Sequence, residues 1–585
     1  MSSELPAALQ LFPHPELRSY QTQFLRFIEK NPKVIIHAPV GFGKTLMSLI
    51  STLPMVRSTD VRTPPYQLWI FVRTKAQIFH VFLKEISKIA NSKKYGYLTA
   101  VPLINKADLC VKLDMIPHFH RGICVHIRCP LLEKARSIPE EDLPAIVEQI
   151  PITSHDGEIN IESFKESLSD FGCPYYVVKR VIPYSNIIVT THTYLRNKTL
   201  QDMLFRMLSR SSFVNKICLL DEAHNFSADF EAEISLNDIH KARSVIPLKV
   251  FDTLQELIQK RNGKVDRPKN LSSNAIDAFL DHQSKLSIWE KSNLFSIKDF
   301  LEARGDYWIS ESDKLLQLNP FPYSTFKFVN NNFKKIIMMS GTFLPLNSYK
   351  ILYGISNYSH LRIPSDFQYS LNGIMYHRRF TSRYRERSIR NYKAMASVIQ
   401  RLHQSNPFHT IVFATSHDLK QQIHAFTSFP DTYIEKPGQP LNFIDELQER
   451  NHECIFGVIG GRLSEGVEIL HPQTKRSLLT LIIIAGIPFT RPDATNNLIK
   501  NLYIKRWGTK MADHLTRLPI TRGITQSIGR GIRSETDFAA SLILDFRAVN
   551  LRSMLPPVRI FRDIQGMYNA YDIFFSKMRT QFHIE

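Results

Sequence analysis

The sequence predicts an α/β protein with two doubly wound domains, each a parallel sheet with helices on both faces. Two observations predict this fold. Short apolar strands alternate with helix-like segments in two separate sets along the chain, and continuous apolar strands of this kind are typical of buried parallel sheets. A length of 585 residues also allows roughly three or four folding units at ~100–200 residues each.

The first set of elements starts near the N-terminus. A helix is expected over residues 20–29, a strand over 33–37, and a helix from residue 46 after a glycine-containing loop. The other strands of this set are expected at 68–72, 186–190, 216–220 and 335–339. Those of the second set are expected at 410–414, 455–459, 479–484 and 540–544.

Two stretches interrupt the first set and are interpreted as insertions into the first domain. Residues 106–174 are rich in cysteine, histidine, proline and charge. Residues 236–330 show helix-like patterns, at 251–260 and 274–285, with few strand signals. The predicted domains are therefore a first domain over 1–105, 175–235 and 331–345, a Cys-rich insertion, a helical insertion, and a second domain over 346–585.

The charge balance favours a polyanionic partner. The chain has 74 Lys and Arg against 54 Asp and Glu, which gives a net charge of +20. Such a field attracts nucleic acid, although it does not distinguish DNA from RNA and also suits a generally basic soluble protein. No apolar run approaches the ~20 residues that cross a bilayer, and residues 1–10 do not resemble a secretory signal. We therefore expect no membrane partner and an intracellular location: the nucleus in a eukaryote, the cytoplasm in a prokaryote or virus.

A glycine-rich segment after the first strand predicts a nucleotide site. It contains Gly41, Gly43, Lys44 and Thr45 between a strand and a helix, the context in which backbone amides cradle phosphates. Lys44 is expected on the β- and γ-phosphates and the Thr45 hydroxyl on Mg²⁺. Ala38 stands where the usual pattern has its first glycine.

An acidic motif supports this site. The apolar strand over 216–220 ends in Asp221, Glu222, Ala223 and His224. A carboxylate at the carboxyl end of a strand can hold the metal, and its neighbour can activate the attacking water. We assign Asp221 to Mg²⁺ and Glu222 to the general base, and the two motifs together predict ATP as the substrate.

Two arginines near the C-terminus are candidates for stabilising transferred phosphate. Arg530 and Arg533 are three residues apart, so that on a helix they would share one face. Arginine offers planar, permanently charged donors that suit a γ-phosphate. Gly529 and Gly531 are poor choices for a helix that is only solvated.

Four of the six cysteines suggest a metal centre. Their spacing is not the paired spacing of a zinc ribbon, whereas thiolate ligation of an iron–sulfur cluster tolerates irregular spacing. These residues are Cys110, Cys124, Cys129 and Cys173. Three nearby histidines, His118, His120 and His126, keep zinc open as an alternative. A second alternative is that the four cysteines are ordinary buried thiols. Cys218 and Cys454 lie in expected strands and are interpreted as core.

Taken together, these motifs resemble those of the XPD/DinG-like iron–sulfur helicases of superfamily 2. The matches are collinear over residues 12–547. The segment 340–342 resembles the family's coupling motif, and 72–77 resembles a motif that contacts nucleic acid. The segment 461–468 resembles the family's glycine-rich segment, but Glu468 stands where the family usually has Asp.

The resemblance implies more than the residues show by themselves. It implies two RecA-like motor domains, adenine recognition by Arg18 and Gln21, a nucleotide role for Gln526, and a 4Fe-4S cluster on the four cysteines. It also implies that the Cys-rich insertion and the helical insertion, called the arch, form a pore and wedge that separate strands, with 5′ to 3′ movement on single-stranded DNA. Forked DNA and a larger repair or transcription complex are the partners that it implies.

A basic and aromatic segment is the expected nucleic-acid track. Residues 378–393 interleave several arginines with Phe380 and Tyr384, which offers phosphate contacts and stacking faces. The same segment also suits a solvated entry to the second domain. The sequence thus predicts an ATP-dependent DNA helicase in repair or transcription. A helicase for RNA or RNA–DNA hybrids, and a structural subunit that uses ATP as a switch, are the alternatives.

Overall fold

The structure is a computed structural model in which the chain forms two compact units. The first unit comprises Met1–His37, Gly43–Ile363 and Pro492–Lys505, and the second Ala38–Phe42, Pro364–Arg491 and Arg506–Glu585. The structure describes residues 17, 20–39, 41–57, 64–86, 98–112, 124, 128–150, 161–259, 262–268, 271, 288–364, 369–429, 432–436, 443–450, 452–464, 469–471, 473–474, 476–490, 492–532 and 537–584. Among these residues, no helix has the length and apolar character that a bilayer crossing requires.

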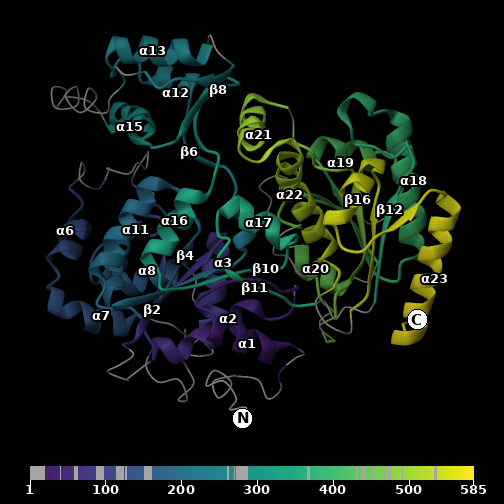
Figure 1. The fold of residues 1–585 in the computed structure, drawn as a ribbon, viewed down its shortest axis with the longest axis horizontal. Coiled ribbons are helices and arrows are strands. Elements are labelled where there is room, and N and C mark those ends of the chain that lie inside the picture. Colours follow the sequence, from purple (N-terminus) through teal and green to yellow (C-terminus); the bar gives the residue numbers. More distant parts are fainter. Residues whose placement is uncertain are drawn as a thin grey trace. The chain divides into compact units, whose positions relative to one another are not determined.

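The first unit is built on a seven-stranded parallel sheet (Figure 1). The strand order is β11-β1-β10-β5-β2-β4-β3. Its strands are β1 (Lys33–His37), β2 (Tyr66–Val72), β3 (Ala100–Leu103), β4 (Ile187–Thr191), β5 (Asn215–Leu220), β10 (Lys335–Ser340) and β11 (Ser359–Arg362). Its helices are α1 (Gln21–Lys30), α2 (Lys44–Val56), α3 (Lys75–His80), α10 (Thr193–Arg196), α11 (Lys198–Arg210), α16 (Tyr323–Asn332) and α17 (Leu346–Tyr353).

The second unit repeats this plan with the strand order β14-β15-β13-β16-β17-β12-β18. Its strands are β12 (Ser370–Met375), β13 (His409–Ala414), β14 (Thr432–Ile434), β15 (Cys454–Val458), β16 (Leu479–Ala485), β17 (Ala539–Ile543) and β18 (Arg559–Phe561). Its helices are α18 (Ile389–Ser405), α19 (His417–His424), α20 (Phe443–Glu449), α22 (Thr509–Ile528) and α23 (Ile564–Phe582).

The central strand of the second sheet shows why apolar runs predicted this fold. Every residue of β16 is buried. Leu481 and Ile483 belong to the core on one face of the sheet, and Ile482 and Ile484 to the core on the other. Because successive side chains point to opposite faces, a strand covered on both sides is apolar at nearly every position, and Thr480 is the exception in β16. The predicted parallel α/β architecture is confirmed.

The insertion over 236–330 contains more strand than the sequence predicted. Together with the preceding β6 (Asp229–Ser235), it forms an antiparallel sheet in the order β6-β9-β8-β7, with β7 (Gly263–Val265), β8 (Tyr307–Glu311) and β9 (Lys314–Asn319). The helices α12 (Leu236–Lys241), α13 (Leu248–Gln259) and α15 (Ile288–Glu302) accompany it (Figure 1). The helix expected at 251–260 is α13, and the one expected at 274–285 lies outside the described residues.

The expectation of a helical arch is therefore wrong in part, for a local reason. β8 and β9 form a hairpin whose turn residues, Ser312 and Asp313, both have positive φ, 50° and 59°. Such turns usually carry glycine or asparagine, so the Ser-Asp pair gave little sign of a hairpin. We call the sheet β6-β9-β8-β7 and its three helices the arch.

The Cys-rich insertion forms short helices where it is described. These are α6 (Pro130–Ser137), α7 (Leu143–Gln149), α8 (Ile161–Ser169) and α9 (Pro174–Val181). Cys129 and Cys173 are the N-cap residues of α6 and α9, and each is followed by proline. Proline suits the first turn of a helix because its missing N–H would lack an intrahelical acceptor there.

Two segments lie in the first unit although the sequence placed them in the second domain. β11 pairs in parallel with β1, from Val34 opposite Ser359 to His37 opposite Arg362, so the first sheet continues beyond residue 345. Residues Pro492–Lys505, most of α21 (Ala494–Trp507), also belong to the first unit. Neither segment differs in composition from its neighbours in the chain, so only tertiary pairing reveals the placement.

Candidate nucleotide site and nucleic-acid interface

The predicted phosphate loop connects β1 to α2. Gly41 and Gly43 both have φ of +81°, a left-handed conformation that glycine adopts without strain. Gly43 is the N-cap of the 13-residue helix α2, whose first two residues are Lys44 and Thr45. The N-terminus of α2, which is the positive end of the helix dipole, therefore follows directly on the loop that the sequence predicts to bind phosphate.

The residues predicted to recognise adenine, Arg18 and Gln21, lie near the N-terminal end of the first unit. Gln21 is the first residue of α1 and is buried. A Cβ placed on Gly43 would lie 3.7 Å from the Gln21 side-chain nitrogen, so Gln21 borders the phosphate loop. Arg18 lies outside the described residues.

The acidic motif follows β5 as expected and meets the phosphate-loop helix. The Thr45 hydroxyl donates to Asp221 Oδ2 at 3.0 Å. These two oxygens come from different elements and have the hard-donor chemistry that Mg²⁺ prefers. Thr45 and Asp221 thus fit the predicted metal position, where they would hold Mg²⁺ and the ion would neutralise phosphate charge.

The two adjacent carboxylates have opposite titration behaviour. Burial and the neighbouring Glu222 carboxylate raise the pKa of Asp221 to about 6. Burial by itself would raise the pKa of Glu222, but hydrogen bonds from His224 and Ser340 and the charge of Lys44 hold it well below its usual range. Glu222 is therefore an ionised acceptor at neutral pH, as a general base requires. A cation beside Asp221 would favour its carboxylate form as well.

A polar relay joins Glu222 to the coupling motif after β10. Ser340 donates to Glu222 Oε2 at 3.1 Å, and His224 Nδ1 lies 3.1 Å from the same oxygen. Thr342 Oγ1 lies 2.9 Å from His224 Nδ1, and the Thr342 amide donates to Ser340 Oγ at 2.9 Å. Glu222 itself has φ of 47°, which is rare for a residue other than glycine and is typical of functional sites.

Sequence reasoning missed two residues that support this relay. His192 is fully buried, and its Nε2 lies 2.8 Å from the Asp221 carbonyl. The Tyr353 hydroxyl donates to the Ala223 carbonyl at 2.9 Å. Both brace the backbone of the acidic motif. The only signal for His192 was its position directly after the apolar strand β4, which many core residues share.

The arginine motif is placed differently from the prediction. α22 ends at Ile528, so Arg530 follows the helix in a turn, and Arg533 lies outside the described residues. A Cβ on Gly531 would come within 2.5 Å of Ala539 Cβ and 2.8 Å of the Leu479 carbonyl. After α22 ends, the backbone at Gly531 thus passes so close to β16 and β17 that a side chain there would have no room. Gln526 lies in the last turn of α22, and its carbonyl accepts from Arg530 Nε at 3.4 Å.

A buried carboxylate holds the glycine-rich segment of the second unit. Glu435 accepts the amides of Val458 and Arg462, each at 3.0 Å. A Cβ on Gly461 would lie 2.9 Å from Glu435 Oε1, so glycine leaves room for the carboxylate. Glu435 was missed because its partners are 23 and 27 residues distant. Glu468 and the three residues before it lie outside the described residues.

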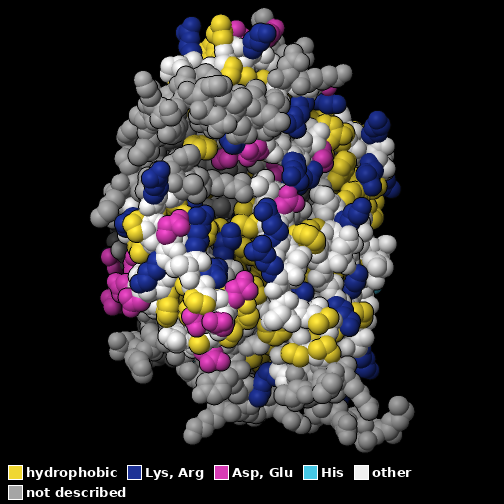
Figure 2. Space-filling model, turned by 90° about the vertical axis from the view of Figure 1, so that its left-hand side faces the viewer, with side chains coloured by type: hydrophobic (Ala, Val, Ile, Leu, Met, Phe, Trp, Pro, Cys, Tyr) yellow, Lys and Arg dark blue, Asp and Glu magenta, His cyan; other side chains and the backbone are white. Residues whose placement is uncertain are grey.

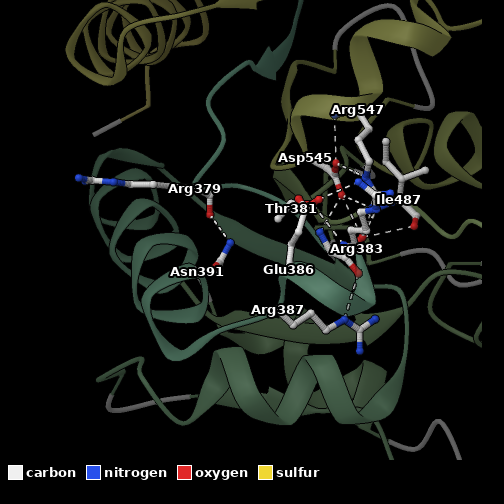
Figure 3. A network of polar contacts seen from close by, with 10 residues as sticks. Arg379, Thr381, Arg383, Glu386, Arg387, Asn391, Ile487, Asp545 and Arg547 are labelled. Carbon is white, nitrogen blue, oxygen red and sulfur yellow. Dashed lines mark hydrogen bonds and ion pairs between the residues drawn. The ribbon is translucent and has the colours of Figure 1, made fainter.

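The basic segment is anchored by a second buried carboxylate (Figure 3). Asp545, with no exposed surface, accepts two hydrogen bonds from the Arg547 guanidinium, at 2.9 Å and 2.6 Å. It also accepts the amide and hydroxyl of Ser382, each at 2.9 Å. The Ser382 hydroxyl oxygen in turn accepts the Ile487 amide at 3.0 Å. The start of the segment is thus fixed beside the carboxyl ends of β16 and β17.

The arginines of this segment divide into two groups. Arg387 donates from Nε to the Ser382 carbonyl at 3.0 Å, so it stabilises the turn. Arg383 is exposed and pairs with Glu386 at 2.8 Å. Arg385 is exposed, and 79% of Tyr384 is accessible to solvent. The exposed members present cations in the same segment as the exposed Tyr384 ring, and the guanidinium over that ring, 5.8 Å from its centre, belongs to Arg387.

The first unit also presents cations beside apolar groups. On the face shown in Figure 2, Lys and Arg side chains lie along the middle of the surface next to hydrophobic side chains. Near the cysteines, Lys106 lies 5.5 Å from the centre of the Tyr176 ring and Lys179 lies 5.4 Å from that of Tyr175. The exposed cations of this surface suit a polyanion.

The structure gathers the four predicted cluster cysteines into one region. Cys124 and Cys129 share a small hydrophobic cluster with Leu132. Burial raises the pKa of the Cys110 thiol, and the nearby Cys124 and Cys129 raise it further. Burial likewise raises the pKa of Cys173, which the backbone amides of the next two tyrosines oppose by hydrogen bonding.

The metal geometry itself is not formed in the structure. Within the described part of the chain, no three histidine, cysteine or acidic side chains are close enough to hold a metal ion. The three histidines that kept zinc open, 118, 120 and 126, lie outside the described residues. Cys218 and Cys454 are buried in β5 and β15, which confirms their interpretation as core.

Comparison with known sequences identifies relatives of the whole chain. Residues 388–557 match the helicase C-terminal domain family, and residues 70–241 match the DEAD_2 family. The ATP-dependent DNA helicase XPD of Sulfolobus acidocaldarius is 23% identical over 570 residues, 92% of this chain and 97% of the relative. The ATP-dependent DNA helicase CHL1 of Kluyveromyces lactis is 22% identical over 65% of this chain and 57% of its own length.

A third relative and two solved structures extend the comparison. The general transcription and DNA repair factor IIH helicase subunit XPD/RAD3 of Saccharomyces cerevisiae is 26% identical over 37% of this chain and 29% of its own. A solved XPD helicase has a TM-score of 0.67 at 22% identity, and covers 94% of this chain and all of its own. Xpd4 of S. tokodaii has a TM-score of 0.60 at 15% identity, and covers 93% of this chain and all of its own.

The structures show that the fold is shared, with two RecA-like domains, and the sequence matches run in the same order as the motifs described above. The two matched families together cover more than half of the chain. This chain belongs to the XPD/DinG-like helicases of superfamily 2.

Proposed function

We propose that the protein is an ATP-dependent DNA helicase that translocates on single-stranded DNA. The observation that carries this proposal is the relay from Glu222 through His224 and Ser340 to Thr342. It connects the residue assigned to water activation with the segment that resembles the coupling motif. A protein that bound ATP without coupling its hydrolysis to another site would not require this connection.

The proposed hydrolytic site uses residues of both motifs of the first unit. The α2 N-terminus and Lys44 bind the phosphates, and Thr45 with Asp221 would hold Mg²⁺. Glu222, which is ionised at neutral pH, accepts a proton from the attacking water. Arg530 and Arg533 are proposed to stabilise charge on the transferred phosphate, Gln526 to contact the nucleotide, and Arg18 with Gln21 to read adenine.

The proposed nucleic-acid track follows the exposed cations of the second unit. Arg383 and Arg385 supply phosphate contacts, and Tyr384 supplies a stacking face. The sequence contains no recognisable base-reading module, so we expect structure-dependent rather than sequence-specific binding. DNA is favoured over RNA because relatives with the motifs in this order are named DNA helicases. Movement from 5′ to 3′ is proposed by resemblance.

A 4Fe-4S cluster on Cys110, Cys124, Cys129 and Cys173 is proposed as the cofactor of the inserted domain. In support, the thiols lie in one region, and backbone amides hydrogen-bond to two of them, an arrangement that stabilises thiolates. Four ligands from separate segments of this insertion would cross-link it internally, which is the structural contribution of such a cluster.

A role within a larger repair or transcription complex is proposed from the yeast relative, which is named as a subunit of such a factor. An ATP-switched structural subunit remains the second candidate function. The intact set of Lys44, Asp221 and Glu222 favours hydrolysis over switching alone.

Duplexes with a single-stranded tail test the proposed activity. We would compare DNA duplexes that carry a 5′ or a 3′ tail, and RNA duplexes of the same sequence, with and without ATP. We expect ATP-dependent separation of the 5′-tailed DNA. Separation of the RNA duplex with equal efficiency would favour the alternative substrate, and ATP-dependent binding without any strand separation would favour the structural subunit.

A further inference from the structure

α21 occupies an unusual place in the chain. In sequence it stands between β16 and α22, which both belong to the second unit. Its residues up to Lys505 nevertheless lie in the first unit. Among the described residues, α21 contacts β8 and β9 of the arch and the residues directly after β9.

An apolar contact holds the first half of α21 on the arch sheet. Three arch side chains are buried in it, Ile309, Leu316 and Leu318, and the residues of α21 that pack against them are Ala494, Leu498 and Ile499. Positions 494 and 498 are four residues apart, so they share one face of the helix. α21 therefore covers apolar strand residues that would otherwise face water.

The N-terminus of α21 is capped from the arch. Glu311, the last residue of β8, accepts the Ala494 amide at 2.9 Å and the Thr495 hydroxyl at 2.5 Å. The first amides of a helix have no intrahelical acceptor, and a negative charge there also interacts favourably with the helix dipole. Thr495 is 6% exposed, so water competes little for this contact.

The other end of α21 is held as well. The Tyr503 hydroxyl donates to the Pro320 carbonyl at 3.3 Å, directly after β9. The Tyr503 ring stacks on Phe321 with the ring centres 5.7 Å apart. Three hydrogen bonds, the apolar cluster and one ring stack thus tie α21 to β8, β9 and the residues directly after β9.

A single glycine, Gly508, joins α21 to α22, the helix that leads to the arginine motif. Gly508 lies between α21 and α22, with φ of 80° and ψ of 164°, which is accessible essentially only to glycine. No atom lies within 4 Å of a Cβ placed there, so the joint is not packed. α22 is 20 residues long, about 30 Å at 1.5 Å per residue, and carries Gln526 in its last turn with Arg530 two residues beyond.

We propose that α21 transmits nucleotide-driven movement of the second motor domain to the arch, so that ATP hydrolysis is coupled to strand separation. Gly508 is the joint, α22 connects it to Gln526 and Arg530, and Glu311 is a positioning residue that fastens α21 to the arch. This inference rests on the proposed helicase function, because it assigns the arch a task within that activity.

The test uses the full chain with the contact removed by Glu311→Ala combined with Thr495→Val. Glu233→Gln is the matched control, because Glu233 is an exposed carboxylate of the same sheet, paired with Lys314 and distant in sequence from Glu311. Thr495→Ser restores the hydroxyl and is the conservative variant. All variants are compared with the parent in thermal midpoint, so that a folding defect is recognised.

The first measurement does not depend on unwinding. Hydrogen exchange of amides in β8, β9 and α21 is followed with and without a non-hydrolysable ATP analogue. We expect the analogue to change exchange in the arch at least threefold in the parent, in Glu233→Gln and in Thr495→Ser, and to leave the arch unchanged in the double variant. An equal response of the arch in the double variant would overturn the proposal.

The second measurement is the number of base pairs separated per ATP hydrolysed. We expect the double variant to retain DNA-stimulated hydrolysis within about twofold and to lose at least fivefold in base pairs separated per ATP. A parallel fall of hydrolysis and unwinding would mean that α21 is only a structural brace, and overturns the proposal. If the parent hydrolyses ATP but separates no strands, the helicase function fails, and hydrogen exchange still decides whether α21 transmits movement.

Discussion

At the scale of single residues, the hydrolytic site depends on the difference between two adjacent carboxylates. Asp221 accepts from Thr45 and has its pKa raised to about 6, whereas Glu222 is held ionised by His224 and Ser340. Asp221, which contacts the helix after the phosphate loop, is therefore suited to bind the metal cation. Glu222, which lies in the polar relay, is suited to accept a proton from water. The two side chains were assigned to these tasks from their order after β5, and their surroundings are consistent with that assignment.

Substitutions of Lys44 and Glu222 should abolish hydrolysis by different routes. Lys44→Ala removes a phosphate contact and should weaken ATP binding at least tenfold. Glu222→Gln keeps the shape of the side chain but cannot accept the proton, so binding should remain within about threefold while turnover falls by 10² or more. Nucleotide binding by fluorescence and phosphate release measure the two effects. Hydrolysis by either variant at the parent's rate would contradict the site assignment.

The exposed arginines of the basic segment should determine the salt dependence of DNA binding. Each phosphate contact on a single strand contributes ~0.7 to the log–log slope of affinity against salt. Arg383→Gln combined with Arg385→Gln should lower the slope by about 1.4. Arg401→Gln is the control, because Arg401 is exposed on α18 and paired with Asp572. An unchanged slope in the double variant would remove this segment from the track.

At the scale of elements, the second unit contains buried histidines that fold in the neutral form. His409 on β13 has no exposed surface; its Nδ1 accepts the Glu453 amide at 2.9 Å, and its Nε2 lies 2.8 Å from the Leu447 carbonyl. Burial and the nearby His452 lower the pKa of His409 to about 4. Burial and the same neighbour lower the pKa of His403, on α18, to about 3.

These histidines predict that the second unit loses stability in mild acid. Both folded-state pKa values lie below the unfolded value of ~6.5, so the unfolded chain binds more protons as the pH falls below 6.5. Stability is fully present above pH 6.5 and is lost toward pH 4, at up to about 1.4 kcal/mol per pH unit for each histidine. Urea unfolding between pH 7 and pH 5 measures this loss.

Protonation of His409 at Nδ1 would also break its bond with the Glu453 amide. His409→Asn should therefore unfold at lower urea at pH 7 but with a shallower dependence on pH. His417→Asn, a histidine at the start of α19 that is not buried, is the control. An equally steep pH dependence in the His409 variant would show that other groups cause the acid sensitivity.

At the scale of the whole molecule, the Cys-rich insertion is proposed to carry an iron–sulfur cluster. The cysteine proposal predicts that protein purified without oxygen is brown and contains about four irons per chain. Replacing any one ligand by serine should release the iron, whereas Cys218→Ser and Cys454→Ser, which change only core packing, should retain it. Because the proposed hydrolytic residues lie outside the insertion, ligand variants should keep some DNA-stimulated hydrolysis while strand separation fails.

Metal analysis and visible absorbance test the cluster. Stoichiometric zinc without iron in anaerobic protein would favour the zinc alternative that the sequence left open. Full strand separation by Cys173→Ser would show that the cluster is not required for the wedge.

The sequence by itself determined the two parallel sheets and the order of the motifs. The buried positions of β1, and all of β16 except Thr480, are apolar because both faces of each sheet are buried, and that pattern can be recognised without a structure. The phosphate loop and the acidic motif are also local, since each consists of a strand end and the few residues that follow it.

Only the tertiary structure decided which distant residues meet. The Glu435 contact with the glycine-rich segment, the Asp545 contact with Ser382 and the Glu311 contact with Thr495 join residues that are 23 to 184 positions apart. A buried carboxylate needs donors to offset its desolvation, but the sequence does not say which donors the fold will bring. The same reason explains the arch hairpin and α21, whose partners are set by long-range packing rather than by local pattern.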